Sequence, residues 1–297
     1  MKVSVVIRTF NRPEVVKRLL ARLNKQSCND FEVVLVCQGS RDECEGIKRD
    51  AQINYPLKYC YQALPEAARA RNTGIEQSAG EIILFLDDDL KPADNLIEAH
   101  LANYADQRVG IVGGRVLEEK RQKDIPAAKI GMVRRFDGYG YDGFHQDVKV
   151  SVMHVKGGNM SVKRQVAFEV GGFDERFAGS AEYEEFDFCL RVLKKGYRII
   201  YEPKAVIEHF ALRYGGCHYC IQTQEQAVYW LYRNHTLAFI NNFNKLFLPV
   251  LIVECILRLF RRSLISLNPG IIKSGLKGFR DGWKTHFGRP QKGLLLK

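Results

Sequence analysis

The segment EIILFLDDDL, residues 81–90, joins a run of apolar residues directly to three consecutive aspartates. Carboxylates this close repel one another, and removing them from water is costly unless a cation or hydrogen-bond donors compensate. Taken alone, the segment fits either an ordinary acidic turn at the end of a strand or a site that receives a metal ion. The acidic turn is the more common of the two.

The surrounding sequence alternates between strand and helix patterns over residues 1–115. Apolar, β-branched runs predict strands, and the segments between them have helical periodicity. Strands this apolar, alternating with helices, predict an α/β fold with a parallel sheet covered on both faces. Ligands bind such sheets at the carboxyl ends of the strands. The aspartates lie at such an end, and so do Thr9–Asn11 and Cys37–Ser40. The predicted strands are 3–9, 31–37, 57–61 and 81–87.

The composition is that of a soluble globular protein, with 46% hydrophobic and 27% charged residues. The N-terminal apolar run is too short for a signal peptide, and no stretch reaches the roughly 20 apolar residues that span a bilayer. The eight cysteines form no framework, which favours reduced thiols. Cys217 and Cys220 have the spacing of zinc ligands, but the second pair that a structural zinc site needs is missing.

The net charge of +11 is concentrated in a tail. Residues 258–297 contain ten Lys/Arg and one Asp, a net charge of +9, and the rest of the chain has a net charge of only +2. This asymmetry indicates an anionic partner, either membrane or nucleic acid.

The twelve apolar-rich residues 246–257 are too short to span a membrane. With the residues that follow, they predict an amphipathic helix with a basic edge, suited to an anionic bilayer surface. The alternative is a helix packed on the catalytic domain or on a second subunit. The polar stripe is Glu254, Arg258, Arg261 and Arg262, and the apolar positions are Leu251, Ile252, Cys255, Ile256, Leu259 and Phe260.

Several stretches together resemble the family 2 glycosyltransferases, which are inverting enzymes with a GT-A-type fold. The matching stretches are VSVVIRTFNRP (3–13), ARNTG (70–74), ILFLDDD (83–89), GGNMSVKRQVAFEVGGFDERF (157–177) and EEFDFCLRVLKKGYRIIYEPKAVIEH (184–209). The resemblance implies a Rossmann-like, mostly parallel sheet flanked by helices, with a nucleotide-sugar-binding half at 1–115 and an acceptor-binding and catalytic half at 116–215. The amphipathic pattern and the basic charge of the tail predict a helical, membrane-associating C-terminal extension at 216–297.

In that family the aspartate motif holds a divalent cation that bridges the two phosphates of a nucleotide sugar. In an extended segment Asp87 and Asp89 face one way and Asp88 the other. Carboxylate oxygens suit Mn²⁺ or Mg²⁺. The resemblance implies Asp89 as a direct ligand, Asp87 near the ribose or the metal, and His209 as a further ligand, although a single histidine is more often structural.

The resemblance also implies a donor site. Thr9, Phe10 and Asn11 would contact the base and the ribose. Arg71 would contact the nucleotide, and Gly158 would contact the sugar. Asp87 and Asp88 would line the same site. This chain has Arg8 where the family usually has proline. It has Cys37 and Gln38 where the family usually has an acidic residue, and Gln38 can hydrogen-bond a base edge. For Arg71 the alternative is a solvated helix residue, and for the turn at 157–160 plain turn chemistry.

An inverting transfer needs a general base for the acceptor hydroxyl. By resemblance Glu185 takes the position of the base, with Asp187 as its rival. Glu182 and Glu184 are explained by the preference of acidic residues for the positive end of a helix. Residues 118–124, EEKRQKD, are predicted to be a solvated charge run. The Gly- and aromatic-rich stretch 134–144 is interpreted either as a loop that stacks on an acceptor or as a surface excursion.

These features favour a metal-dependent inverting hexosyl- or deoxyhexosyltransferase. It would use a UDP-, dTDP- or GDP-linked sugar and a glycan or lipid-linked acceptor in surface polysaccharide synthesis. It would be cytoplasmic, peripheral on the inner face of the membrane, and would bind no nucleic acid; a homo-oligomer stays open. The alternatives are a sugar nucleotidyltransferase and a catalytically inactive nucleotide-sugar-binding module. A nucleic-acid binder would leave the acidic cluster unexplained.

Overall fold

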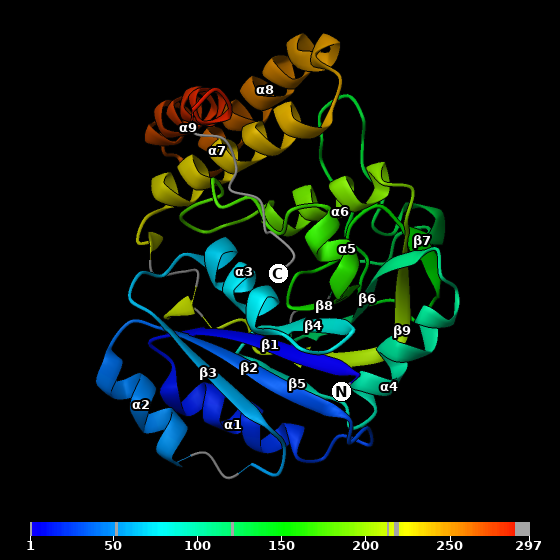
Figure 1. Cartoon of the computed structure of the whole chain (residues 1–297). Helices are drawn as coiled ribbons and strands as arrows, with labels where there is room; N and C mark the ends of the chain where they lie inside the picture. The colour runs from blue at the N-terminus through cyan, green and yellow to red at the C-terminus, as the bar shows by residue number, and fades with distance from the viewer. Residues whose placement is uncertain (1, 51–52, 120–121, 213, 217–219, 289–297) are drawn as a thin grey trace.

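The computed structural model describes residues 2–50, 53–119, 122–212, 214–216 and 220–288 (Figure 1). Its strands form one mixed sheet in the order β3-β2-β1-β4-β8-β6-β9-β5, and β7 pairs with β9. The strands are β1 Val3–Phe10, β2 Phe31–Gln38, β3 Leu57–Gln62, β4 Ile82–Leu86, β5 Leu90–Pro92, β6 Val109–Glu118, β7 Val150–Val152, β8 Asn159–Lys163 and β9 Arg198–His209.

The predicted α/β class and the parallel pairing of β1–β4 are confirmed. The sheet is more mixed than the sequence predicts, because β8 runs antiparallel to both β4 and β6. β6, which the periodicity did not reveal, covers residues 109–118 and so crosses the expected boundary at 115/116.

Helices cover both faces of the sheet. One face packs against α1 (Pro13–Leu23), α2 (Arg41–Asp50) and α4 (Leu96–Leu101), and the other against α3 (Ala67–Gln77), α5 (Arg164–Glu169) and α6 (Glu184–Lys194) (Figure 1). Successive side chains of a strand point to opposite faces. In β1, Val5 and Ile7 therefore enter the first core and Val6 the second, and all three are buried. This double burial is why these strands read as continuous apolar runs.

The sheet brings together the polar residues that follow its parallel strands. Ile7 of β1 pairs with Leu86 at the end of β4, and Phe10 pairs with Gln38 at the end of β2. The aspartates that follow Leu86 consequently lie beside the end of β1. The register thus places residues about 80 positions apart in sequence at one edge of the sheet.

The expectation of reduced thiols is wrong for one pair. Cys37 at the end of β2 and Cys44 in α2 form a disulfide, with their Cα atoms 5.8 Å apart. The short turn from strand to helix folds the two residues onto each other, a proximity that cysteine spacing alone does not reveal. Cys28, Cys60, Cys189 and Cys255 are free thiols. The zinc-like spacing of Cys217 and Cys220 is not tested, because Cys217 lies outside the described residues.

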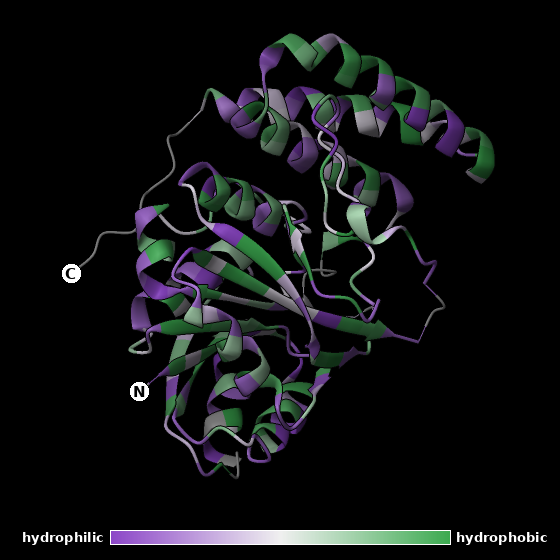
Figure 2. Ribbon diagram, turned by 90° about the vertical axis from the view of Figure 1, so that its right-hand side faces the viewer, coloured by the Kyte–Doolittle hydropathy of each residue, from purple (hydrophilic) through white to green (hydrophobic). Residues whose placement is uncertain are grey.

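The C-terminal extension forms a helical layer on one side of the molecule, away from β1–β3 (Figures 1 and 2). It contains α7 (Gln224–Asn242), the 3-10 turn η4 (Lys245–Phe247), α8 (Leu248–Ser266) and α9 (Gly270–His286). These helices share their own core, to which α8 contributes Leu251, Cys255 and Leu259. Within the described residues, none of the helices combines the length and apolar character that crossing a bilayer requires.

His100 of α4 gives the fold a predictable response to acid. Its ring nitrogens contact Ser161 Oγ and Asn159 Oδ1 of β8, each at 2.9 Å. Burial lowers the pKa of His100 from its usual 6.5 to about 4, although the hydrogen bond to Asn159 acts against this. The unfolded chain therefore takes up a proton below pH 6.5 that the folded chain does not accept until about pH 4.

We expect the free energy of unfolding to fall as the pH drops from 6.5 to 5, with His100 contributing about 2 kcal/mol of the loss. Urea titrations at the two pH values measure it. His100→Gln, which keeps polar partners for β8 but does not titrate, should show a smaller loss. An identical loss in the variant would contradict this role of His100.

Candidate active site

A cleft of about 250 Å³ opens where β1 and β4 end and α6 begins. A smaller cavity of about 150 Å³ shares Arg8, Asp87 and His209 with it, so the two adjoin. The cleft is lined in part by Arg8, Arg71, Asp87, Gly158, Glu185 and His209, and the smaller cavity adds Arg12, Asp88 and Asp89.

Arginines and hydrogen-bond donors compensate the negative charge of the three aspartates. Arg8 Nη2 lies 3.1 Å from Asp87 Oδ1. Arg12 Nη1 lies 2.7 Å from Asp88 Oδ1 and 3.2 Å from Asp89 Oδ2, and its side chain is only 4% exposed. The three aspartates do not alternate between two sides, as they would in an extended strand. β4 ends at Leu86 and the chain bends at Asp88 and Asp89, so these two share one arginine.

Arg12 is a residue that the sequence reasoning missed. Besides the aspartates, it donates to the carbonyl oxygens of Leu212 and Tyr214, 200 residues away or more. It therefore ties the end of β1 to the segment after β9. The signal was present in the stretch TFNRP, where a basic residue directly precedes α1.

His209 lies between two carboxylates. Its Nε2 is 3.3 Å from Asp89 Oδ1, and its Nδ1 is 3.3 Å from Glu118 Oε1. Burial opposes protonation of His209, but the hydrogen bond and charge of Asp89 outweigh it and raise its pKa to about 9. Burial likewise opposes ionisation of Asp89, whereas His209 and Arg12 lower its pKa to about 2. Glu118, expected in a solvated run, instead ends β6 in the cleft.

The predicted metal ligands supply the donor types that a divalent cation prefers. Asp87, Asp89 and His209 line the same smaller cavity, and carboxylate oxygens with a neutral imidazole suit Mn²⁺ or Mg²⁺. Across the described residues, no three such side chains are already gathered closely enough around one point to hold an ion. Asp87 is paired with Arg8 and Asp89 with His209.

Arg71 and Glu184 form a buried ion pair that links the two sides of the cleft. Arg71 contacts Glu184 through Nη1 and lies 3.7 Å from Asp87 Oδ1 through Nη2. The side chains of Arg71 and Glu184 are 5% and 2% exposed. The interpretation of Arg71 as a solvated helix residue is therefore wrong. Glu184 does open α6, as expected, but it is also buried against Arg71. Gly158 allows the backbone of its turn to lie close to the Asp87 carboxylate, because a Cβ at position 158 would collide with that side chain.

Glu185 borders two cavities. It is partly exposed and lines the cleft together with Asp87 and Gly158. It also lines an adjoining cavity of about 180 Å³, which includes His154, Lys156 and Tyr183. Burial lowers the pKa of Lys156, but Asp142, Glu118 and Glu185 outweigh it and raise the pKa, so its ammonium stays charged. A carboxylate between two cavities can exchange a proton with a ligand that reaches it from either side.

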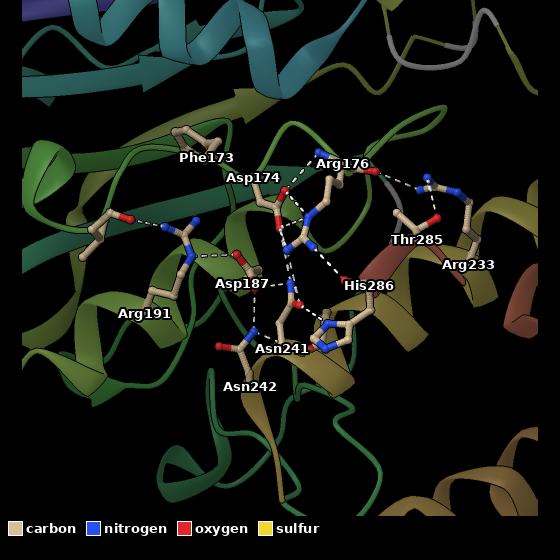
Figure 3. Close-up of polar contacts among 12 residues, drawn as sticks. Phe173, Asp174, Arg176, Asp187, Arg191, Arg233, Asn241, Asn242, Thr285 and His286 are labelled. Carbon is tan, nitrogen blue, oxygen red and sulfur yellow. Dashed lines mark hydrogen bonds and ion pairs between the residues drawn. The ribbon is translucent and has the colours of Figure 1, made fainter. Parts of the chain in front are cut away.

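The rival residue Asp187 lies in a different environment (Figure 3). It is fully buried and accepts hydrogen bonds from Arg191 Nε at 2.8 Å and Asn242 Nδ2 at 2.6 Å. Asp174, Arg176 and Asn241 complete a polar cluster that joins α6 to α7. The structure does not bring Asp187 to the cleft.

The predicted donor loop lies beside the aspartates. Thr9 Oγ1 donates to Asp88 Oδ2 at 2.7 Å, and Asn11 has a left-handed backbone with φ of 53°. Gln38 is buried, and its Nε2 donates to the carbonyl oxygens of Leu64 and Glu66. This amide group is thus engaged with the segment before α3 rather than presented to a base. Thr9, Phe10, Asn11 and Gln38 are not among the residues that line the cavities above.

Similar proteins are glycosyltransferases. The glucosyl-dolichyl phosphate glucuronosyltransferase of Haloferax volcanii is 26% identical over 226 residues, 72% of this chain and 71% of that protein. The GalNAc(5)-diNAcBac-PP-undecaprenol β-1,3-glucosyltransferase of Campylobacter jejuni is 26% identical over 222 residues, 69% of this chain and 67% of that protein.

Solved structures share the fold. The structure of S. aureus TarS 1–349 with UDP-GlcNAc has a TM-score of 0.65 at 15% identity, covering 96% of this chain and 81% of that one. The Pyrobaculum calidifontis mannosyltransferase PcManGT with GDP-Man and Mn²⁺ has a TM-score of 0.60 at 16% identity, covering 96% and 87%. A family model, glycosyl transferase family 2, matches residues 4–171. This match includes nearly all of β1, all of β4 and the three aspartates that line the smaller cavity. The chain therefore belongs to glycosyl transferase family 2 and is a glycosyltransferase.

Proposed function

We propose that the chain is a metal-dependent, inverting glycosyltransferase that moves a hexosyl or deoxyhexosyl group from a nucleotide sugar to a hydroxyl of a glycan or lipid-linked acceptor. The observation that carries this proposal is the place of Glu185. Its carboxylate lies between the cleft that contains the aspartates and the cavity lined by Tyr183 and Lys156. The first cavity is assigned to the donor and the second to the acceptor.

In this assignment Glu185 accepts the proton of the acceptor hydroxyl. The freed oxygen bonds to the anomeric carbon while the bond from that carbon to the nucleoside diphosphate breaks. Because attack comes from the side opposite the leaving group, the configuration inverts. Asp187, buried in its own cluster, holds α6 against α7 rather than exchanging this proton.

The departing diphosphate needs positive charge. Arg8, Arg71 and Lys156 line the cleft and supply it from the protein. Asp87, Asp89 and His209 would hold Mn²⁺ or Mg²⁺, which when bound adds further positive charge beside the phosphates. Asp88 instead fixes Thr9 and Arg12, and so shapes the donor loop formed by Thr9, Phe10 and Asn11.

The acceptor is proposed to be lipid-linked, in surface polysaccharide synthesis. Two similar proteins are named for substrates on dolichyl phosphate and on undecaprenol diphosphate. Residues 1–115 would bind the donor. Residues 116–215 would bind the acceptor and include the general base. The basic extension at 216–297 would touch an anionic membrane from its cytoplasmic, inner face.

A panel of UDP-, dTDP- and GDP-sugars tests this function. We expect one nucleotide sugar to raise the melting temperature in the presence of Mn²⁺ and to be hydrolysed slowly to a nucleoside diphosphate. EDTA should abolish both effects. Release of pyrophosphate from a nucleoside triphosphate and a sugar phosphate would instead indicate a nucleotidyltransferase. Binding of a nucleotide sugar with neither hydrolysis nor transfer would indicate an inactive binding module.

A further inference from the structure

Exposed apolar side chains are concentrated on one helix. Of the eighteen large hydrophobic side chains that are exposed within the described residues, eleven belong to residues 246–267. Scattered exposed apolar residues are normal on a protein surface, whereas a contiguous group marks an interaction site. The segment is α8 with its flanking residues.

The two sides of α8 differ in their surroundings. Leu251, Cys255, Leu259 and Ser263, spaced four residues apart, are buried. The opposite side, called the outer face of α8 below, is apolar and exposed, with Leu257 at 60% and Leu264 at 70%. Hydrophobic residues thus cover both sides of the helix, and only one side packs in the core of the extension. The outer face consists of Val250, Val253, Ile256, Leu257, Phe260 and Leu264.

This corrects the sequence-based assignment of the membrane-facing side. Leu251, Cys255 and Leu259 pack in the core of the extension. Arg258 turns inward, with Nη2 3.4 Å from the buried Asp137 and its guanidinium 3.8 Å from the centre of the Tyr139 ring. The two interpretations of α8, packing and surface binding, therefore apply to opposite sides of one helix.

Exposed basic residues lie on α8 and on α9, which packs against the buried side of α8 where Gly275 meets Leu259. Arg261 is exposed on α8, and α9 carries Lys273, Lys277, Arg280 and Lys284, all exposed. These four follow the i, i+4, i+7, i+11 spacing of one helix face, opposite the buried Gly275, Gly278 and Gly282. Two copies that met through this face would bring together two tails, each with a net charge of +9 over residues 258–297. An anionic surface matches both the charge and the apolar side chains.

We propose that the outer face of α8 inserts into the interface of an anionic lipid bilayer while the basic row of α9 attracts the headgroups. An interfacial helix buries its apolar face at the boundary between headgroups and acyl chains, and basic residues add salt-dependent attraction. No span is needed for this mode of binding.

The same helix is linked by packing to the cavity that Tyr183 and Glu185 line. Arg258 of α8 lies over the Tyr139 ring, and the rings of Tyr139 and Tyr183 both pack on His235. Docking α8 on a bilayer would therefore bring the cleft to the surface that holds a lipid-linked acceptor. This last step rests on the proposed transfer to a lipid-linked acceptor, whereas the docking identifies the side chains that would make the membrane contact proposed above.

Sedimentation with vesicles tests the docking. We expect the intact protein to bind phosphatidylglycerol vesicles, to bind phosphatidylcholine vesicles at least 10-fold more weakly, and to be released by 0.5 M NaCl, an ionic strength that screens surface charge. Leu257→Glu with Leu264→Glu should lower binding to the anionic vesicles at least 10-fold. Lys273→Glu with Lys277→Glu should lower it and reduce its dependence on salt. Leu64→Glu, at a residue 59% exposed outside the extension, is the matched control and should bind as the parent does.

Point substitutions are used because deleting residues 258–297 would also remove α9, whose Gly278 and Gly282 pack directly on the backbone of α7. An absence of anionic vesicle binding in the parent protein, or unchanged binding in the α8 variant, would overturn the proposal. So would a dimer that the α8 variant converts to a monomer without any effect of vesicles, which would assign the face to a second copy. Donor hydrolysis without lipid should be the same in the α8 variant and the parent. Vesicle binding without any glycosyl transfer would refute the proposed function and leave the docking intact.

Discussion

Glu185→Gln is expected to lower the turnover of sugar transfer by about 10²–10⁴-fold, the usual contribution of a positioned general base. The amide keeps the size of the carboxylate but accepts no proton. Donor affinity should change little, because the donor is held mainly by the residues around Asp87 and Arg71. Steady-state kinetics at saturating donor, together with donor titration, measures the two quantities separately.

Two variants, one just before α6 and one within it, control this result. Glu182→Gln alters an exposed carboxylate of the same cleft and should cost much less activity. Asp187→Asn weakens the contacts with Arg191 and Asn242, so it should lower stability and affect turnover only as far as α6 shifts. A stable Asp187→Asn protein with collapsed turnover, beside a nearly normal Glu185→Gln protein, would reverse the assignment of the base.

Asp89→Asn is expected to abolish Mn²⁺-dependent donor binding while the fold is kept. The amide is a poor ligand for a divalent cation, but its oxygen can still accept the hydrogen bond from the Leu212 backbone N–H, which is 2.9 Å in the parent. Repulsion among three aspartates would by itself predict a gain in stability. The structure predicts the opposite, because Arg12 and His209 hold the carboxylate in its charged form.

The depressed pKa of Asp89 sets the size of this loss. A folded-state value of about 2, against 3.8 ordinarily, stabilises the folded protein at neutral pH by about 2 kcal/mol. This contribution is present above the unfolded-state pKa and is lost as the pH falls through the folded-state value. Calorimetric titration with Mn²⁺ and donor, and urea unfolding without metal, test the two parts. Asp94→Asn, at an exposed aspartate nearby, is the control. Turnover that still depends on Mn²⁺ in Asp89→Asn would contradict the metal assignment.

Much of the site's location could be predicted from the sequence. The strands β1 and β4 are long apolar runs because both faces of the sheet are covered, and this local pattern does not depend on distant contacts. The position of the aspartates at a strand end follows from the same pattern. The family motifs placed Arg71, Glu185 and His209 near them, and the structure brings these residues to one cleft.

Local patterns could not distinguish residues by their distant partners. Glu184 and Glu185 are neighbours of the same type, yet one is buried against Arg71, 113 positions away, and the other faces two cavities. Asp187 looked like a rival base until α7 supplied Asn242 as its partner. The role of Arg12 depends on the segment after β9, whose carbonyl oxygens accept its hydrogen bonds.

The sequence by itself therefore determined the α/β class, the strand-end location of the acidic cluster, and the amphipathic, basic character of the extension, since each depends on periodicity, composition or charge along the chain. Only the tertiary structure decided which carboxylates are buried, which cysteines pair, and which side of α8 is exposed. Those outcomes depend on contacts between residues far apart in sequence, where burial and a nearby opposite charge, rather than residue type, fix the state of an ionisable group.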